Sequence, residues 1–420
     1  MMRLFVLATA FCLCSANTFA TDYDCGEIPG TVTCSLSADG KSMTVTGSGA
    51  IKGYQNNENR PWLKTVESVV MDDTITAVGQ RAFKGATKLT SVVMPGVVTI
   101  ENSAFNATKL VTVDLPNVET VGQSAFENVS TLKSVNIPKA TSIGLQAFYQ
   151  TSSLETINMP EVKSVGEKAF YKATSLTSVD LPNAEVIEGQ AFQMATSLTT
   201  VSIPSATEIK YDAFQGDTNL TIVEATSVET IGNRAFKDCS GLETLDLPSL
   251  ITLAKDVFIN DVGLTEIYAP NLQVIGNAAF YHTGLTSVDL PSLVEISGSA
   301  FENSSNLAYV SFPENVVITG GRQFNGTQIS LLTYYLEDGS KIYGVCPGYI
   351  MSGKGCVSSC GTDYRPDNGK CVPNPCGENE VLYGDECMDE YPFAKKRYTP
   401  AEAGKWIKDK DNVVTLTFKK

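Results

Sequence analysis

The sequence predicts a solenoid of about twelve coils, each about 22 residues long and built mostly from short parallel strands and turns. Three observations predict it. One phrase, typified by "IGNRAFKDCSGLETLDLP" at residues 231–248, recurs along most of the chain. A phenylalanine returns about every 22 residues, and a short apolar–polar–apolar alternation ending in proline accompanies it. An internal period of this length indicates a repeat architecture and so decides the fold class.

The recurring phenylalanine sets the register of the repeats. Alanine precedes it in ten of its twelve copies, which leaves room for the ring. One coil cannot bury such a ring alone, so we expect the rings of successive coils to stack in one internal column. The positions are Phe83, Phe105, Phe126, Phe148, Phe170, Phe192, Phe214, Phe236, Phe258, Phe280, Phe301 and Phe324.

Each repeat also contains a short strand of the pattern V-x-L-P. Because strand side chains alternate between two faces, the Val and Leu positions should point inward and the middle residue outward. Proline lacks the N–H that would continue the ladder, so it should end the strand at the same place in each coil. The following apolar residues, such as Val118 and Val121, then re-enter the interior.

The segment before the repeats is expected to hold a signal peptide and a cap. Residues 1–20 combine Arg3, an apolar run and a small-residue ending, which predicts a secretory signal peptide cut after Ala20. Without cover, the first coil would expose the ring column. We therefore assign residues 21–65 as an N-terminal β cap.

The cap is expected to contain a hairpin and a disulfide. The stretch "SADGKSMTVTG" predicts a hairpin with a two-residue turn at Asp39-Gly40. Cys25 and Cys34 lie just upstream, and export permits disulfides, so we expect them to form a bridge.

The solenoid is assigned to residues 66–336, after which the composition changes to Gly, Pro, Asn and Cys. Residues 337–388 form three loops of similar length, which favours a stalk stapled by local disulfides. A zinc site is the alternative, but the spacing lacks paired C-x-x-C motifs. Residues 389–420 predict a small helix–strand element. The favoured cysteine pairs are Cys346–Cys356, Cys360–Cys371 and Cys376–Cys387.

Charge argues against a nucleic-acid partner, and hydropathy argues against a transmembrane segment in the mature chain. The formal net charge is −15, with most of the acidic excess on the repeats. Nucleic-acid binding needs clustered basic residues, so we expect no nucleic-acid partner. Nothing after the signal peptide is long and apolar enough to span a bilayer, so the mature chain should have no transmembrane segment.

The sequence names no catalytic, metal or cofactor-binding residue. Its one histidine, His282, follows Phe280 by two residues at a variable, exposed position with no nucleophile marked beside it. Cys239 stands where other copies place Ala or Val, which predicts a small buried core residue. Phosphate-binding, zinc-protease and nucleophile-elbow motifs are not found. We therefore expect a protein that is not an enzyme.

The repeat resembles the BspA-like (type 5) bacterial leucine-rich repeat, whose units read L-P-x-x-[IV]-x-x-I-G-x-x-A-F-x-x-C-x-x-L. The resemblance covers about Leu36 to Leu332. One copy carries it through Leu115, Pro116, Val118, Val121, Gly122, Ala125, Phe126 and Leu132.

This resemblance implies an exported, surface-associated leucine-rich-repeat protein. Members of the family are typically cell-surface proteins of host-associated microbes, implicated in adhesion, so it implies an extracellular protein ligand such as a host matrix or plasma protein. The alternative is a structural component of a cell envelope or matrix whose copies associate with one another. An enzyme with an unfamiliar carboxylate site is a further alternative, but the sequence offers no residues for it.

The outward strand positions should form two columns along one face. Most hold Ser, Thr, Asn or Asp, which cross-strand hydrogen bonding and solubility explain. The C-terminal third differs, because Glu, Asp and Tyr replace small polar residues there, and tyrosine is enriched at interaction hot spots. We expect this patch to bind a protein with a basic surface, through Glu224, Asp246, Glu266, Tyr268, Asp289 and Tyr309.

Overall fold

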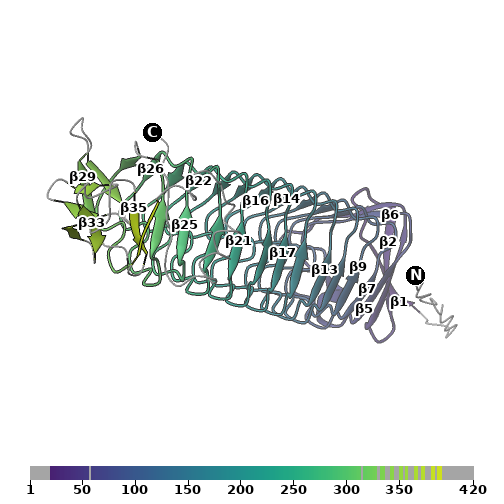
Figure 1. Ribbon diagram of the computed structural model, residues 1–420. Helices are drawn as coiled ribbons and strands as arrows, with labels where there is room; N and C mark the ends of the chain where they lie inside the picture. The colour runs from purple at the N-terminus through teal and green to yellow at the C-terminus, as the bar shows by residue number, and fades with distance from the viewer. Residues whose placement is uncertain are drawn as a thin grey trace, which may run out of the picture.

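The computed structural model is an elongated solenoid whose coils stack side by side along one axis (Figure 1). It describes residues 19–55, 58–313 and 316–328, together with the backbone of short strands between residues 332 and 389. Most of the predicted signal peptide (1–18) and of the predicted C-terminal element (390–420) lies outside the described residues.

The N-terminal part contains six strands and one 3-10 turn. They are β1 (Phe19–Asp24), β2 (Val32–Ser37), β3 (Ser42–Gly47), β4 (Gly49–Ile51), η1 (Pro61–Lys64), β5 (Ser68–Met71) and β6 (Ile75–Val78). Strands β1, β2, β3, β5 and β7 form one sheet, in that order, so the hairpin of the cap continues directly into the coils.

Each later coil contributes a three-residue strand and a two-residue strand. The three-residue strands are β7 (Ser91–Val93), β9 (Thr112–Asp114), β11 (Ser134–Asn136), β13 (Thr156–Asn158), β15 (Ser178–Asp180), β17 (Thr200–Ser202), β19 (Ile222–Glu224), β21 (Thr244–Asp246), β23 (Glu266–Tyr268), β25 (Ser287–Asp289) and β27 (Tyr309–Ser311). The two-residue strands are β8 (Thr99–Ile100), β10 (Thr120–Val121), β12 (Ser142–Ile143), β14 (Ser164–Val165), β16 (Val186–Ile187), β18 (Glu208–Ile209), β20 (Thr230–Ile231), β22 (Thr252–Leu253), β24 (Val274–Ile275), β26 (Glu295–Ile296) and β28 (Val317–Ile318).

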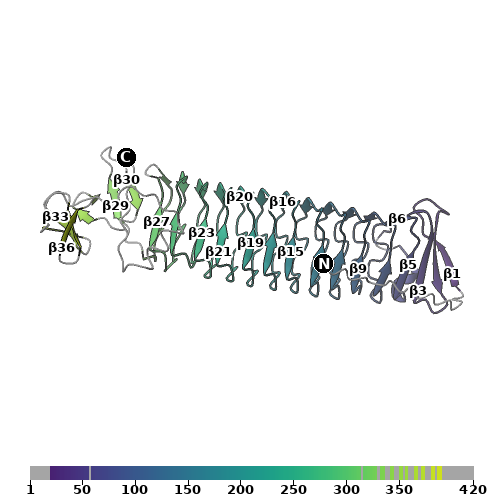
Figure 2. The ribbon, with the colours of Figure 1, turned by 45° about the vertical axis from the view of Figure 1, so that its right-hand side comes forward.

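The two sets of strands form different sheets on two sides of the solenoid (Figure 2). The even-numbered strands from β4 to β28 form one continuous parallel sheet of thirteen strands. The odd-numbered strands β7 to β27 form what we call the odd-strand face, and their ladder is interrupted. It divides into β9–β13, β15–β19, β21–β23 and β25–β27.

The phenylalanine rings stack in one buried column, as the sequence predicts. Successive rings from Phe83 to Phe324 lie 5.0–5.6 Å apart between centroids, with interplanar angles of 2–13°. All of them are at most 1 % exposed. This column and the buried Val, Ile and Leu residues around it form a single core along the solenoid. The predicted fold class is confirmed.

The predicted strand orientation is also confirmed. In the coil of β9, Val113 and Leu115 are 2 % and 1 % exposed, whereas Asp114 between them is exposed. The Leu115 N–H donates to the Asn136 carbonyl of the next coil at 2.8 Å. Pro116 follows and has no N–H to offer, so the ladder ends there.

Two residues in each coil adopt a left-handed backbone that the sequence did not reveal. They lie two positions before and two positions after the phenylalanine, as Ser103 (φ 57°) and Ala107 (φ 57°) do around Phe105. Their N–H groups donate to the next coil, to the carbonyls of Gln123 and Glu127, both at 2.8 Å. Hydrogen bonds between coils therefore hold these residues in a backbone conformation that glycine would adopt more easily.

The N-terminal hairpin is confirmed, but its turn differs from the prediction. Strands β2 and β3 pair with Leu36 opposite Met43, so the connection is longer than two residues. Asp39 accounts for the longer loop, because its carboxylate accepts hydrogen bonds from the Ser37 hydroxyl (2.7 Å) and the Lys41 N–H (3.0 Å). Gly40 then closes it with φ at 69°.

The expected bridge between Cys25 and Cys34 is present, with the Cα atoms 5.9 Å apart. In the same N-terminal part, Trp62 covers the first ring of the column, with centroids 6.3 Å apart between Trp62 and Phe83. The Trp62 indole N–H donates to the Ala82 carbonyl at 3.1 Å. These contacts close the N-terminal end of the core.

The cysteine-rich segment contains three hairpins. They pair β31 (Ile350–Ser352) with β32 (Gly355–Val357), β33 (Tyr364–Asp367) with β34 (Lys370–Pro373), and β35 (Glu380–Tyr383) with β36 (Glu386–Asp389). A further hairpin, β29 (Leu332–Tyr335) with β30 (Lys341–Gly344), precedes them. The positions of Cys346, Cys360 and Cys376 and all six cysteine side chains lie outside the described residues, so their bonding remains a prediction.

Candidate functional site

The register of the odd-strand face brings the predicted columns together. Within each piece of the ladder, equivalent residues of successive coils lie directly opposite one another. Asn136 faces Asn158, Ser202 faces Glu224, and Asp246 faces Tyr268. The two outward columns that the sequence predicts therefore exist, on the strands of the odd-strand face (Figure 2).

Five of the six predicted binding residues are exposed on this face. They belong to four consecutive coils, and the aromatic one is 48 % exposed. We call the five residues the acidic patch: Glu224, Asp246, Glu266, Tyr268 and Asp289.

The interruptions of the ladder divide the acidic patch into three groups. Glu224 belongs to the last strand of one piece, the β21–β23 pair carries Asp246, Glu266 and Tyr268, and Asp289 begins the next piece. For the sixth predicted residue, Tyr309, the backbone lies in β27 opposite Ser287, but its side chain lies outside the described part.

Two further residues extend the acidic patch, and the sequence prediction did not include them. Ile222 is 51 % exposed and stands on the same strand as Glu224, on the same face. Glu243 immediately precedes β21 and is exposed. The signal for Ile222 was its place in the first outward column, where the other copies before it hold Ser or Thr.

Charge is segregated across these coils. Between residues 177 and 289 the chain holds only four basic residues. Each pairs with a carboxylate on the turns around the phenylalanine, away from the odd-strand face: Lys210 with Glu188 (2.8 Å), Arg234 with Asp212 (2.7 Å), Lys237 with Asp238 (4.0 Å) and Lys255 with Asp256 (3.6 Å).

The acidic patch is left without a counter-charge. Among the described residues, the ion pairs and side-chain hydrogen bonds do not include its carboxylates. Five carboxylates, counting Glu243, therefore stand beside two exposed apolar side chains, Ile222 and Tyr268, with no lysine or arginine on the same strands. The odd-strand face of these coils therefore combines unpaired negative charge with exposed apolar area.

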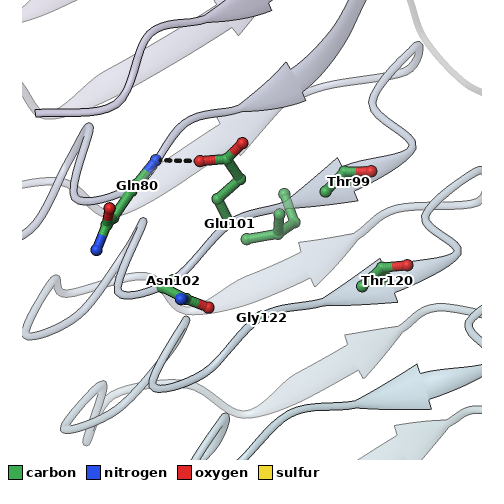
Figure 3. A pocket seen from close by; sticks show the side chains of 7 residues that line it. Gln80, Thr99, Glu101, Asn102, Thr120 and Gly122 are labelled. Carbon is green, nitrogen blue, oxygen red and sulfur yellow. Dashed lines mark hydrogen bonds between the residues drawn. The ribbon is translucent and has the colours of Figure 1, made fainter.

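A shallow depression lies on the other side of the solenoid, along β8, β10 and the turns that follow β6, β8 and β10 (Figure 3). Its polar groups serve the coils themselves. The Glu101 carboxylate accepts the Gln80 N–H at 2.8 Å, and the Asn102 side-chain oxygen accepts the Gln123 N–H at 2.8 Å. We assign no ligand to it. The lining residues are Gln80, Thr99, Ile100, Glu101, Asn102, Thr120 and Gly122.

Cys239 and His282 lie where the sequence predicts them, one in the core and one on the surface. Cys239 is fully buried, and burial raises the pKa of its thiol well above the ordinary value. His282 is exposed, and its Nδ1 lies 3.2 Å from the side-chain oxygen of Asn260. Within the described ranges, no cluster of His, Cys, Asp and Glu has the geometry of a metal site. Nor does this part of the chain contain a helix that could cross a membrane.

The fold and the regular outward face define a leucine-rich-repeat solenoid. The family model described as "BspA type Leucine rich repeat region (6 copies)" matches residues 62–173, 163–280 and 229–343. The chain belongs to this family, as its repeat motif indicates. Comparison with curated proteins finds no match.

Solved structures of similar proteins come from several bacteria. A leucine-rich repeat protein from Bacteroides ovatus shares 21 % identity over 70 % of this chain and 91 % of its own, with a TM-score of 0.43. One from Eubacterium ventriosum shares 20 % over 76 % and 98 %, with a TM-score of 0.37. A leucine rich cell surface protein from Faecalibacterium prausnitzii shares 18 % over 70 % and 94 %, with a TM-score of 0.30.

Proposed function

We propose that this protein is an exported, surface-associated leucine-rich-repeat module that binds other proteins and catalyses no reaction. Its partner is an extracellular protein with a basic surface, of the kind that host matrix and plasma proteins present. Membership of the BspA type family supports this proposal. A long and regular exposed face also suits recognition better than chemistry, because repeat proteins use such surfaces for binding.

One observation carries the choice of surface. The carboxylates of the acidic patch share one face with Ile222 and Tyr268, while all four basic residues of the same coils are paired elsewhere. Complementary charge speeds encounter and selects the partner, and a half-exposed tyrosine supplies contact area. The patch therefore offers both charge and apolar area.

The test measures binding of the purified mature chain to immobilised matrix and plasma proteins across a salt series. We expect saturable binding that weakens as salt rises, because salt screens exposed charges. Replacing Glu224→Gln, Asp246→Asn and Glu266→Gln together should weaken binding about tenfold or more, and Tyr268→Ala should mainly raise the dissociation rate.

Asp180→Asn is the matched control, because Asp180 is exposed in the same column three coils before Asp246. Its substitution should leave the affinity unchanged. Equal affinity of the control, the triple variant and the unchanged chain would remove the acidic patch from the proposal. Self-association of the chain without any added protein would instead favour a structural role in a cell envelope or matrix.

A further inference from the structure

Three consecutive coils carry unusual side chains at one buried position, the third residue after the phenylalanine. In these coils the position holds Asp217, Cys239 and Asp261, and all three are 0 % exposed. The other coils hold small or hydroxyl-bearing residues there: Ala86, Thr108, Val129, Thr151, Ala173, Ala195, Thr283, Ser304 and Thr327.

In each of the two carboxyl groups, of Asp217 and Asp261, only one oxygen has a hydrogen-bond partner. One oxygen of Asp217 accepts the Ala195 N–H, and one oxygen of Asp261 accepts the Cys239 N–H, each at 2.7 Å. The second oxygen of each has no hydrogen-bond partner. Between them, the Cys239 thiol donates to the Phe214 carbonyl at 3.1 Å. Ionising a carboxyl group in such surroundings is costly, because both side chains are fully buried and neither takes part in an ion pair among the described residues.

The titratable groups around this column do not supply positive charge. Burial raises the pKa of Asp217 and of Asp261 well above the ordinary value, and a backbone hydrogen bond offsets this only in part. The other titratable groups that act on the column are Cys239 and Asp238. The two cations of that coil pair elsewhere, Lys237 with Asp238 and Arg234 with Asp212.

The same coils are weakly joined on one side of the solenoid. Strand β19 does not pair with β21, and β23 does not pair with β25, so β21–β23 is a two-stranded piece of its own. On the opposite side, β18, β20, β22 and β24 remain paired in one sheet. The Asp217 and Asp261 carbonyls each accept an N–H, at 3.0 Å, from the leucine that leads into β19 or β23.

We propose that the coils of Asp217, Cys239 and Asp261 form a proton-controlled joint, closed while both carboxyl groups keep their protons and opened on the odd-strand side when either one ionises. An ionised carboxylate here gains water only if neighbouring coils separate. The interrupted ladder lets the odd strands separate, while the continuous even-strand sheet serves as the hinge (Figure 2). The joint needs no ligand and stands independently of the proposed binding function.

The direction of the pH effect follows from proton linkage. The closed joint holds these protons more tightly than the unfolded chain does. Its stability is therefore complete below the ordinary carboxyl pKa, near 3.8, and is lost as pH rises through the raised values. Each carboxyl group that must ionise should favour opening about tenfold per pH unit between the ordinary carboxyl pKa and its own raised pKa, and opening should level off above the raised pKa.

Hydrogen–deuterium exchange of the intact chain, corrected for the intrinsic exchange rate, tests the joint from about pH 5 to about pH 9. Peptides covering residues 217–264 should lose protection as pH rises. The coils of Thr151 and Ala173 are the internal control, because the odd-strand ladder is also interrupted there, between β13 and β15, without a buried carboxyl group. Their protection should not change.

The matched variant replaces Asp217→Thr and Asp261→Thr together. The chain already uses threonine at this position, where the Thr108 and Thr151 hydroxyls donate to a carbonyl of their own coil at 2.9 and 2.8 Å. This double-threonine variant should keep its protection at every pH. If it does not fold, the double variant Asp217→Asn and Asp261→Asn replaces it in the experiment. The proposal would be overturned if the protection of residues 217–264 did not change with pH. It would also be overturned if protection fell with rising pH to the same extent in the variants, or to the same extent in the control coils.

Discussion

At the scale of single residues, the ring column is the feature that determines the rest. Phe192 lies between Phe170 and Phe214, with ring centroids 5.2 and 5.4 Å away, and is fully buried. The ring repeats because each coil must bury one face against the next. The sequence predicts this column completely, since a large apolar residue that returns at a strict period lines the interior of stacked repeats.

Phe192→Ala should lower the free energy of unfolding by roughly 3–5 kcal/mol, because it removes a buried ring and leaves a cavity between two others. Urea denaturation followed by circular dichroism measures the change. Leu145→Ala is the control, because Leu145 is 37 % exposed and should cost much less. A similar loss for both substitutions would contradict a continuous ring core.

Other residues could not be predicted from the sequence, for physical reasons. Among the described residues, 21 left-handed positions carry side chains, because hydrogen bonds between coils impose that backbone. The burial of Asp217 and Asp261 could not be predicted from residue type, because an aspartate is ordinarily exposed. Only the stacking of the coils shows that their position is buried. Cys239, at the same position, was predicted correctly as a small core residue.

At the scale of elements, the short strands were predictable but their pairing was not. Val, x and Leu before a proline gave the orientation of β9 and its equivalents correctly. The interruptions of the odd-strand ladder occur after coils that keep the proline, as at Pro160 and Pro270, as well as after the coil in which Thr226 replaces it. No single residue of the sequence predicts where these interruptions occur.

The N-terminal hairpin shows the same limit. Its strands and its disulfide were predicted, whereas the loop length depends on hydrogen bonds of the Asp39 side chain. A dipeptide that favours a two-residue turn in isolation is therefore overruled by its neighbours.

Replacing Cys25→Ala and Cys34→Ala together should lower the stability of the hairpin by roughly 2–3 kcal/mol, as expected for a short closed loop. Native-state hydrogen exchange of β2 and β3 measures it. The central coils should keep their protection, because they do not contact the bridge. Equal loss of protection along the whole chain would show that the cap and the coils unfold as one unit.

At the scale of the whole molecule, the solenoid is a nearly one-dimensional array. Each coil contacts its neighbours through the ring column, the even-strand sheet and the turns around the rings. This arrangement was predictable from the period alone. The location of the acidic patch was predicted from the outward columns, but its isolation from the basic residues needed the structure, because ion pairs such as Arg234–Asp212 join separate coils.

Deleting residues 161–182 removes one complete coil and joins Pro160 to Asn183, which occupies the same place in the repeat as Glu161. The shortened chain should fold with the same circular dichroism spectrum per residue, and its denaturant m-value should fall by about one-twelfth. Deleting only residues 161–171 should prevent folding of the adjoining coils. A half-coil deletion as stable as the full one would contradict the shared register.

The covered end of the ring column gives the array a direction. Trp62 closes the first ring, and both Trp62 and the Cys25–Cys34 bridge precede the repeats in the chain. A cap that precedes the repeats in the chain can therefore serve as a template for them. Each further length of about 22 residues needs only to pack on the coil before it, so assembly can proceed from this end without contacts from the C-terminal coils.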